Sequence, residues 1–284
     1  MLEYLESLGM PEAGQYIEEF RGELFVIKCG GSLLENPETG GSVLDDIACL
    51  RRCGIRPVLV HGGSVQANRE MEEAGIEPKR YRGLRITCDR TICILERCFG
   101  QLNCELVDAL EGRGVQAAGF SGARGGLVLG EKMELDGVDL GWVGDVRGVA
   151  RDVWESIGAD CVPVVASLGV GPGGETLNIN ADYVATRLAE LTGARKLILM
   201  TDVDGVCLDP NNASTLVSTL DTERARELIR NGSIAGGMVP KIESAVRAIG
   251  NGLRKVHMIN GRRPHSLLLE IFTSEGVGTQ IIRG

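Results

Sequence analysis

Short β-rich runs alternate with amphipathic helical patterns along the 284 residues of the chain. The strand-like runs are LFVIK (24–28), PVLVH (57–61), QAAGF (116–120), CVPVVAS (161–167), KLILMT (196–201), KVHMI (255–259) and TQII (279–282). Apolar residues recur with helical spacing between them, in residues 42–53, 65–74, 90–110, 181–191, 222–231 and 238–251. This order predicts βαβ units in an α/β fold, a three-layer αβα sandwich around a central, mainly parallel sheet.

Two segments depart from the alternation. Residues 126–146 contain short strand-like runs bounded by glycines, which predict β-hairpins lying over one lobe. Residues 3–20 carry apolar side chains around a break at Gly9 and Pro11, and their later part predicts an N-terminal amphipathic helix. Such a helix either folds onto its own domain or contacts another copy, and the sequence favours neither.

Composition argues against several classes of protein. The formal charge of −9 argues against a broad basic face that binds nucleic acid. Nine cysteines without any Cys-x2-Cys pair favour reduced, mostly buried thiols over a disulfide framework or a zinc site. No apolar run approaches the roughly 20 residues that span a bilayer, and the acidic start lacks the order of a signal peptide. We therefore expect a cytoplasmic protein that binds small molecules and neither nucleic acid nor membranes.

Two of the strand-like runs end in glycine pairs. Lys28 ends the first run and is followed by Gly30 and Gly31, while Gly62 and Gly63 follow the second run. Backbone without Cβ atoms lets N–H groups approach phosphate oxygens closely, and a nearby helix N-terminus and a lysine add positive charge. Either pair alone is more often a tight βα connection, and the P-loop pattern G-x4-G-K-[ST] is absent.

Further polar residues stand at predicted helix starts and strand ends. Asn178, Asn180 and Asp182 occupy alternate positions where a helix begins, which exceeds what one N-cap requires. Thr201 and Asp202 follow an apolar strand and are placed to face a ligand beyond its carboxyl end.

Taken in order, these stretches resemble the amino acid kinase family, and within it the branch that phosphorylates N-acetyl-L-glutamate. The segments that carry the resemblance, nearly end to end, are YIEEFRGELFVIKCGGS, VLVHGG, GLRIT, DLGWVGDV, LNINAD, KLILMTDVDGV, GGMVPKIESAV and HSLLLEIFTSEGVGTQI. The resemblance implies transfer of the γ-phosphoryl group of MgATP to the side-chain carboxylate of N-acetyl-L-glutamate, as in arginine biosynthesis. A carboxylate is ionised at pH 7, so the reaction needs alignment and charge screening rather than a general base.

The same resemblance implies roles for individual residues. Lys28 and Lys241 would stabilise the negative charge on the transferred phosphoryl group, each by on the order of a few kcal/mol. Asp182 would hold both ammonium groups in place. The remaining implied contacts are Gly30, Gly31, Gly62 and Gly63 on the phosphoryl group, Gly62, Gly63, Arg85, Asn178 and Asn180 on the substrate, and Thr201 and Asp202 on the nucleotide. Mg²⁺ would be held mainly by the phosphates, and no protein ligand is expected.

Both chain ends resemble the arginine-sensitive members, which are hexamers joined through the N-terminal helix as trimers of dimers. The resemblance implies that L-arginine inhibits the enzyme and binds near Tyr16, His257 and Glu270. It also implies an oligomerisation helix in residues 1–20, an acetylglutamate-binding N-lobe in residues 21–195 and an ATP-binding C-lobe in residues 196–284.

Some positions depart from the family pattern. Ser64 and Val65 replace a third glycine and a proline in the second turn, GARG (122–125) replaces GKDG-like text, and Cys104 replaces a lysine. Two alternatives stay open. One is a sister kinase that acts on glutamate or α-aminoadipate linked to an acidic carrier protein, and the other is a non-catalytic arginine-sensing module.

Overall fold

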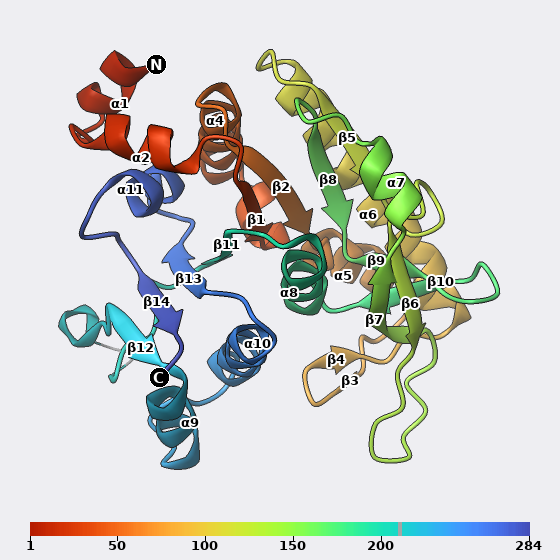
Figure 1. Cartoon of the computed structure of the whole chain (residues 1–284). Coiled ribbons are helices and arrows are strands. Elements are labelled where there is room, and N and C mark those ends of the chain that lie inside the picture. Colours follow the sequence, from red (N-terminus) through yellow and green to blue (C-terminus); the bar gives the residue numbers. More distant parts are fainter. Residues whose placement is uncertain (210–211) are drawn as a thin grey trace.

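A mainly parallel, eight-stranded sheet forms the centre of the molecule, in a computed structural model that describes residues 1–209 and 212–284. In spatial order its strands are β12 (Thr219–Asp221), β14 (Thr279–Ile282), β13 (Lys255–Asn260), β11 (Lys196–Thr201), β1 (Leu24–Cys29), β2 (Arg56–His61), β8 (Val162–Ala166) and β5 (Ala117–Phe120). Neighbouring strands run parallel, with the exception of the antiparallel pair β13 and β14 (Figure 1). The predicted α/β class and central sheet are confirmed.

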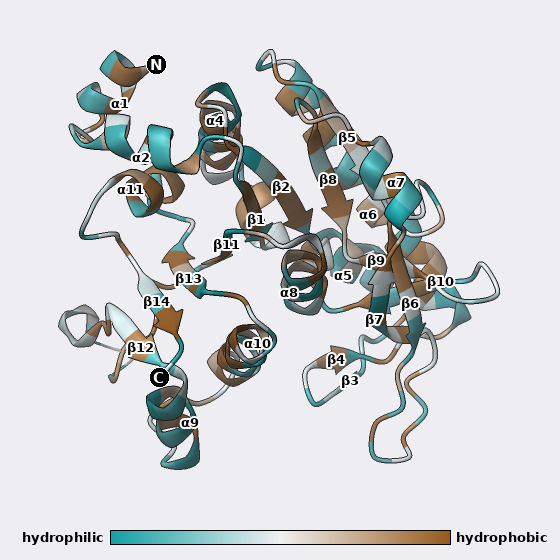
Figure 2. Cartoon of the chain, viewed as in Figure 1, coloured by the Kyte–Doolittle hydropathy of each residue, from teal (hydrophilic) through white to brown (hydrophobic). Residues whose placement is uncertain are grey.

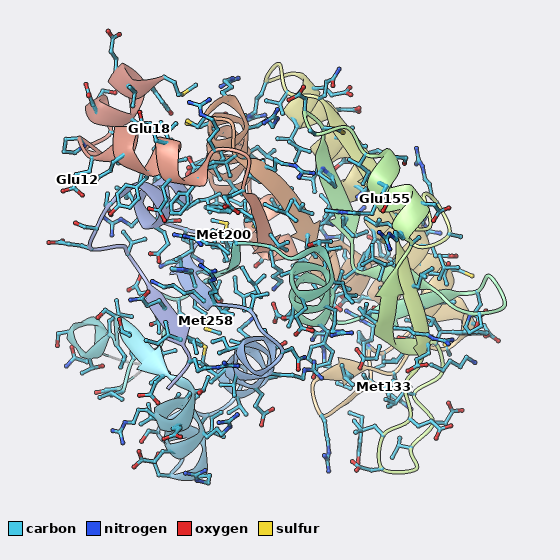
Figure 3. All side chains as sticks on the ribbon, viewed as in Figure 1. Glu12, Glu18, Met133, Glu155, Met200 and Met258 are labelled. Atoms are coloured by element: carbon cyan, nitrogen blue, oxygen red, sulfur yellow. The ribbon has the colours of Figure 1, made fainter. Side chains whose placement is uncertain are left out.

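Helices cover both faces of this sheet. One face packs against α4 (Pro37–Arg52), α6 (Asp89–Glu111) and α11 (Ser266–Phe272), and the other packs against α8 (Ala181–Thr192), α9 (Thr222–Arg230) and α10 (Met238–Gly250). Side chains of a strand alternate between the two faces of the sheet. Met200 of β11 therefore packs in the core beneath α4, α6 and α11, whereas Met258 of β13 packs in the core beneath α8, α9 and α10 (Figure 3). The strands are hydrophobic while the outer faces of the helices are hydrophilic (Figure 2), which gives the predicted three layers.

A smaller sheet lies beyond the carboxyl end of β8. Its strands are β6 (Val128–Lys132), β7 (Val143–Val149), β9 (Leu168–Val170) and β10 (Thr176–Ile179), and they close on themselves. The antiparallel pairing of β6 with β7 confirms the hairpin predicted for residues 126–146. The remaining elements are α3 (Gly31–Leu34), α5 (Ser64–Glu73), β3 (Arg80–Tyr81), β4 (Leu84–Arg85), α7 (Arg151–Ser156) and the 3₁₀ turn Ala213–Thr215.

The N-terminal segment forms two short helices, α1 (Leu2–Ser7) and α2 (Ala13–Phe20), separated by the break around Gly9 and Pro11. Leu5 and Phe20 are buried in the core beneath α4 and α11, so the segment folds onto its own domain. Met1, Leu2 and Tyr4 of the same segment are exposed.

The cysteines are all free thiols, as expected, but only four are buried, Cys29, Cys49, Cys53 and Cys98. The expectation of mostly buried thiols is therefore wrong, because several cysteines lie on outward faces of helices and loops. Across residues 1–209 and 212–284, the longest apolar helical stretch falls short of what a membrane crossing requires.

Candidate active site

Two lysines and one aspartate meet beyond the carboxyl end of β1. Lys28 lies in β1, Asp182 in the first turn of α8, and Lys241 in the first turns of α10. The Lys28 Nζ and Asp182 Oδ1 atoms are 2.9 Å apart, and the Lys241 Nζ and Asp182 Oδ2 atoms are also 2.9 Å apart. Asn180 caps α8: its side-chain oxygen accepts a hydrogen bond from the Asp182 N–H at 2.8 Å. This bond fixes the backbone position of Asp182, and with it the base of the carboxylate side chain.

The charges of this cluster do not cancel. Burial opposes ionisation of Asp182, but Lys28 and Lys241 outweigh it and hold the pKa of the carboxyl well below its usual range. Burial likewise opposes the charge on Lys28, yet the adjacent Asp182 leaves the pKa of this lysine raised. The pKa of Lys241 is lowered by burial and by the nearby Lys28. Two ammonium groups around one carboxylate leave a net positive charge, which suits an anionic ligand.

A cavity of about 180 Å³ opens beside Lys28 and Asp182. Residues predicted from the sequence that line it are Lys28, Gly30, Gly31, Gly62, Arg85, Asn178, Asn180 and Asp182. Gly63 is absent from this lining, and a Cβ built on it would lie 2.6 Å from Cδ1 of Phe99. Glycine at position 63 is therefore required by close packing against Phe99 of α6. Arg80, Phe99 and Ser167 also line the cavity, and the sequence analysis did not single them out.

Arg85 is a buried cation that lacks an acidic partner. Its residue is 6% exposed, its Nη2 donates to Asn68 Oδ1 at 2.6 Å, and its Nη1 lies 3.0 Å from Met71 Sδ. Within the described part of the chain, no carboxylate forms an ion pair with it. Buried charges in proteins are normally paired, so this guanidinium is prepared for a carboxylate that a ligand brings.

A hydrogen-bonded chain lies behind the second glycine turn. His61 is fully buried, and its Nδ1 donates to the Gly62 carbonyl oxygen at 3.0 Å while Nε2 accepts from Asn103 Nδ2 at 3.0 Å. Asn103 Nδ2 also donates to the Val164 carbonyl oxygen at 2.9 Å. Burial lowers the pKa of His61 to about 4, so the ring is neutral and supports the turn from behind.

A second cavity, of about 330 Å³, lies on the other side of Asp182 and has a mainly apolar lining. Thr201, Asp202 and Lys241 line it, together with Val203, Gly205, Val206, Cys207, Ser233, Ile234, Ala235, Gly237 and Met238. The Thr201 hydroxyl donates to the Val203 carbonyl oxygen at 2.8 Å, so it shapes the turn after β11. Lys28 thus borders one cavity and Lys241 the other, with Asp182 between them.

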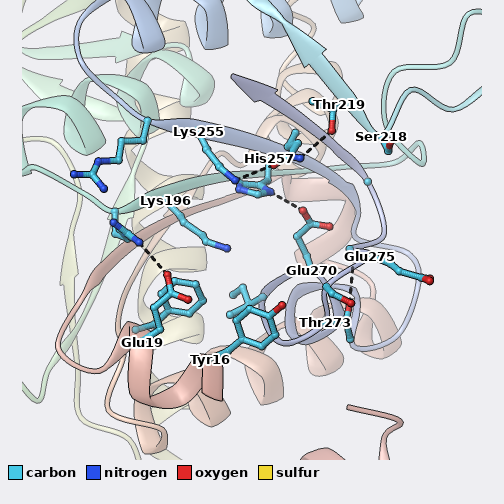
Figure 4. Close-up of a pocket in the computed structure, with 18 residues that line it drawn as sticks. Tyr16, Glu19, Lys196, Ser218, Thr219, Lys255, His257, Glu270, Thr273 and Glu275 are labelled. Atoms are coloured by element: carbon cyan, nitrogen blue, oxygen red, sulfur yellow. Dashed lines mark hydrogen bonds and ion pairs between the residues drawn. The ribbon is translucent and has the colours of Figure 1, made fainter. Parts of the chain in front are cut away.

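The third cavity lies at the opposite edge of the sheet, where β11 and β13 begin, and has a volume of about 530 Å³ (Figure 4). Tyr16, His257 and Glu270 come from α2, β13 and α11, and all three line it. His257 Nδ1 lies 2.5 Å from Glu270 Oε1, and the buried Nε2 of His257 has no partner within the described residues.

Lys196, which the sequence analysis did not single out, also lines this third cavity. Its ammonium group lies 4.6 Å from the centre of the Phe20 ring. Burial lowers the pKa of Lys196 to about 8, and the negative charge of Glu270 only partly opposes this shift. Lys255 adds a second amine to the lining.

Comparison with known proteins gives the same family for the whole chain. Residues 23–260 match the amino acid kinase family. The acetylglutamate kinase of Thermoanaerobacter pseudethanolicus is 42% identical, over 95% of this chain and 91% of the relative. The acetylglutamate kinase of Methanocaldococcus jannaschii is 41% identical, over 100% of this chain and 98% of the relative.

Solved structures agree with this assignment. The N-acetylglutamate synthase of Neisseria gonorrhoeae, complexed with coenzyme A and N-acetylglutamate, has a TM-score of 0.86 at 30% identity and covers 96% of this chain. The matched part is 62% of the synthase chain, so the present chain spans less than two thirds of that protein. The carbamate kinase of Giardia lamblia, at 13% identity and a TM-score of 0.66, shares the fold. The chain is a kinase and belongs to the amino acid kinase family.

Proposed function

We propose that this kinase transfers the γ-phosphoryl group of ATP to the side-chain carboxylate of N-acetyl-L-glutamate, giving N-acetyl-L-glutamyl 5-phosphate in arginine biosynthesis. The observation that carries the proposal is the position of Asp182, whose two oxygens hold Lys28 at one cavity and Lys241 at the other. The names of the relatives, acetylglutamate kinases at about 42% identity over nearly the whole chain, support the substrate.

Each cavity takes one reactant in this proposal. N-acetylglutamate occupies the 180 Å³ cavity, where Arg85 pairs with its α-carboxylate and Asn178 and Asn180 lie alongside. ATP occupies the 330 Å³ cavity, where its base contacts the apolar lining. The residues that line the first cavity all fall between positions 28 and 182, and those that line the second all fall between positions 201 and 241. This separation supports an acetylglutamate-binding lobe in residues 21–195 and an ATP-binding lobe in residues 196–284.

The reaction is an in-line displacement at phosphorus. A side-chain carboxylate oxygen of the substrate forms a bond to the γ-phosphorus while the bond to the β–γ bridging oxygen breaks, and ADP leaves with that electron pair. Lys28 and Lys241 reduce the repulsion between the two anions from either side, and the Gly30–Gly31 and Gly62–Gly63 turns offer N–H groups. No proton has to be removed from an ionised carboxylate, which agrees with a neutral, buried His61.

Magnesium fits this arrangement through the nucleotide. Both oxygens of Asp182 face lysines, so this carboxylate is not free to bind a cation. We assign Mg²⁺ to the phosphates of ATP, where it would screen their charge.

The test is ADP formation that depends on N-acetylglutamate. We expect Lys28→Ala and Lys241→Ala each to lower kcat by about 10²- to 10³-fold, while the exposed Lys132→Ala serves as the matched loss of a lysine. A non-catalytic module predicts no turnover by the unaltered protein. Turnover with a carrier-linked glutamate but not with free N-acetylglutamate would establish the sister kinase instead.

We also propose that L-arginine binds the third cavity and inhibits the enzyme. Glu270 offers a carboxylate for a guanidinium, and Lys196 and Lys255 offer amines for a carboxylate. A structure of the Neisseria synthase complexed with L-arginine, at 28% identity and a TM-score of 0.83, supports an arginine-binding relative of this fold. An inhibition curve with L-arginine, with D-arginine as the control, tests the assignment.

A cytoplasmic hexamer, joined through the N-terminal segment, completes the proposal. The exposed Met1, Leu2 and Tyr4 give α1 an apolar surface that a second copy would cover. Removing residues 1–20 would also expose the core around Phe20, so the double change Leu2→Glu/Tyr4→Glu is the sharper test. We expect it to reduce the oligomer in sedimentation experiments and to weaken arginine inhibition; an unchanged oligomer would reject the proposed contact.

A further inference from the structure

Two arginines lie directly opposite each other in the small hairpin beside the 180 Å³ cavity. The register of the antiparallel pair β3 and β4 places Arg80 opposite Arg85, and Tyr81 opposite Leu84. Residues opposite each other in such a pair point to the same face, with Cβ atoms about 5 Å apart. Both arginines accordingly line the cavity that also contains Lys28.

This pairing is unfavourable unless an anion joins it. Like charges directly opposite each other destabilise a pair of strands. Within residues 1–209 and 212–284, neither arginine forms an ion pair with an acidic group, and Arg80 Nη1 donates only to the Gly83 carbonyl oxygen, at 3.0 Å. The pKa of Arg85 is lowered mainly by burial, and the charge of Arg80 lowers it further.

The neighbouring arginine in the hairpin behaves differently. Arg82 Nη2 lies 2.9 Å from Asp136 Oδ2, its guanidinium stacks 5.9 Å from the centre of the Tyr81 ring, and it does not line the cavity. Arg82 is therefore neutralised by Asp136 of the segment between β6 and β7, whereas within the described residues Arg80 and Arg85 line the cavity without an acidic partner.

We propose that Arg80 is a substrate-specificity residue that, together with Arg85, binds the carboxylate of the acceptor that is not phosphorylated. Two guanidinium groups can share one carboxylate through parallel N–H···O bonds, each oxygen accepting from a different arginine. Lys28, which lines the same cavity, is left for the carboxylate that reacts. The site would thus select small dicarboxylates over monocarboxylates of the same length. This inference rests on the proposed function, and it identifies the second carboxylate of the acceptor as the group that the hairpin recognises.

The experiment compares Arg80→Gln with Arg82→Gln, two changes that remove the same charge from the same hairpin. For Arg80→Gln we expect the KM for N-acetyl-L-glutamate to rise about 10-fold, with the KM for ATP and kcat within about 2-fold of the unaltered enzyme. For Arg82→Gln we expect all three constants within about 2-fold. Arg80→Lys, which keeps the charge but loses the fork of donors, should fall between the two.

An acceptor analogue identifies the group that Arg80 contacts. 4-Acetamidobutyrate lacks the α-carboxylate of N-acetylglutamate, and its competitive inhibition constant should change less than about 2-fold in Arg80→Gln. Calorimetric titration of each ligand into the protein without ATP measures its dissociation constant, so the two ligands can be compared without any phosphoryl transfer. The inference would be overturned by any of three results: an equal loss of affinity for both ligands in Arg80→Gln, equal effects of Arg80→Gln and Arg82→Gln on the KM for N-acetyl-L-glutamate, or an unchanged KM in Arg80→Gln. If the unaltered protein shows no acetylglutamate-dependent ADP formation, the proposed function itself fails.

Discussion

Lys28 and Lys196 lie in neighbouring strands, and each is largely withdrawn from water, but at opposite edges of the sheet. Lys28 lies near the end of β1, whereas Lys196 begins β11 and pairs with Phe25. Lys28 contacts the Asp182 carboxylate, and its pKa is raised; Lys196 contacts the face of an aromatic ring, and burial lowers its pKa to about 8. Burial alone makes a lysine less basic, and at Lys28 the contact with Asp182 outweighs burial. Lys241 touches the same carboxylate, but burial and the nearby charge of Lys28 still leave its pKa lowered.

This difference matches the roles proposed for the two edges. A catalytic ammonium group must stay charged throughout turnover, and at Lys28 the Asp182 carboxylate favours the charged form. A regulatory cavity needs only to bind and release an effector, and there a lysine that titrates close to neutral pH makes the binding adjustable.

Asp182→Asn breaks the contrast at the catalytic edge and should have the largest effect. It leaves Lys28 and Lys241 close together without their counter-charge, so Lys28 should lose the raised pKa that distinguishes it from Lys196. We expect kcat to fall by about 10³-fold. Steady-state ADP formation measures this, with the exposed Asp152→Asn as the matched change. Activity within 10-fold of the unaltered enzyme would show that the shared carboxylate is not needed.

Glu270→Gln breaks the contrast at the other edge. The change removes the carboxylate that accepts from His257 and from the Val277 N–H at 2.7 Å, together with a negative charge that supports the charge on Lys196. We expect the half-inhibiting concentration of arginine, measured against each variant's own uninhibited rate, to rise more than about 10-fold. Glu18→Gln, on the exposed side of α2, is the control. A response equal to that of the control would remove the third cavity from the regulatory proposal.

The pH dependence of inhibition should separate the two lysines directly. The pKa of Lys196 is lowered to about 8, so its charge is present below that pH and is lost as the pH rises through it. A neutral amine binds a carboxylate less well, and the half-inhibiting concentration of arginine should therefore rise by about 5-fold between pH 7 and pH 9. Lys196→Arg, which keeps its charge over this range, should remove most of the dependence. An equal slope in both proteins would assign the titration to another group.

The sequence predicted the elements of the fold better than the contacts between distant residues. The alternation of strand-like and helical patterns was sufficient for the layers and the central sheet. The start of α4 was predicted five residues late, because Gly40 and Gly41 suggest a break; in the structure Asn36 caps the helix, and a Cβ on Gly40 would lie 2.5 Å from the Leu34 carbonyl oxygen. A glycine required by close packing can therefore stand inside a helix.

The site shows the same division. Lys28, Asp182 and Lys241 follow recognisable motifs, and the structure brings them together. Arg80 carries no such signal, since it meets Arg85 only through strand register. The contact of Asn103 with His61, which lies 42 residues away in another element, was not predicted either. Interactions of this kind depend on the packing of helices and the pairing of strands, which hydrophobic periodicity does not encode.

Ser64→Gly should have the smallest effect and shows whether the catalytic edge depends on its charges alone or also on the shape of its turn. Ser64 is the first residue of α5, and it lines the 180 Å³ cavity while remaining exposed to solvent. Restoring glycine there should change kcat and both KM values by less than about 3-fold, since exposed substitutions rarely exceed a few tenths of a kcal/mol. Gly63→Ala is the contrasting change, because its Cβ would lie 2.6 Å from Phe99 and overpacking of this kind costs about 1–3 kcal/mol. If Ser64→Gly altered the KM for ATP as strongly as Gly63→Ala does, the serine would have to touch the phosphates, and the turn would then bind them through a side chain as well as through its backbone.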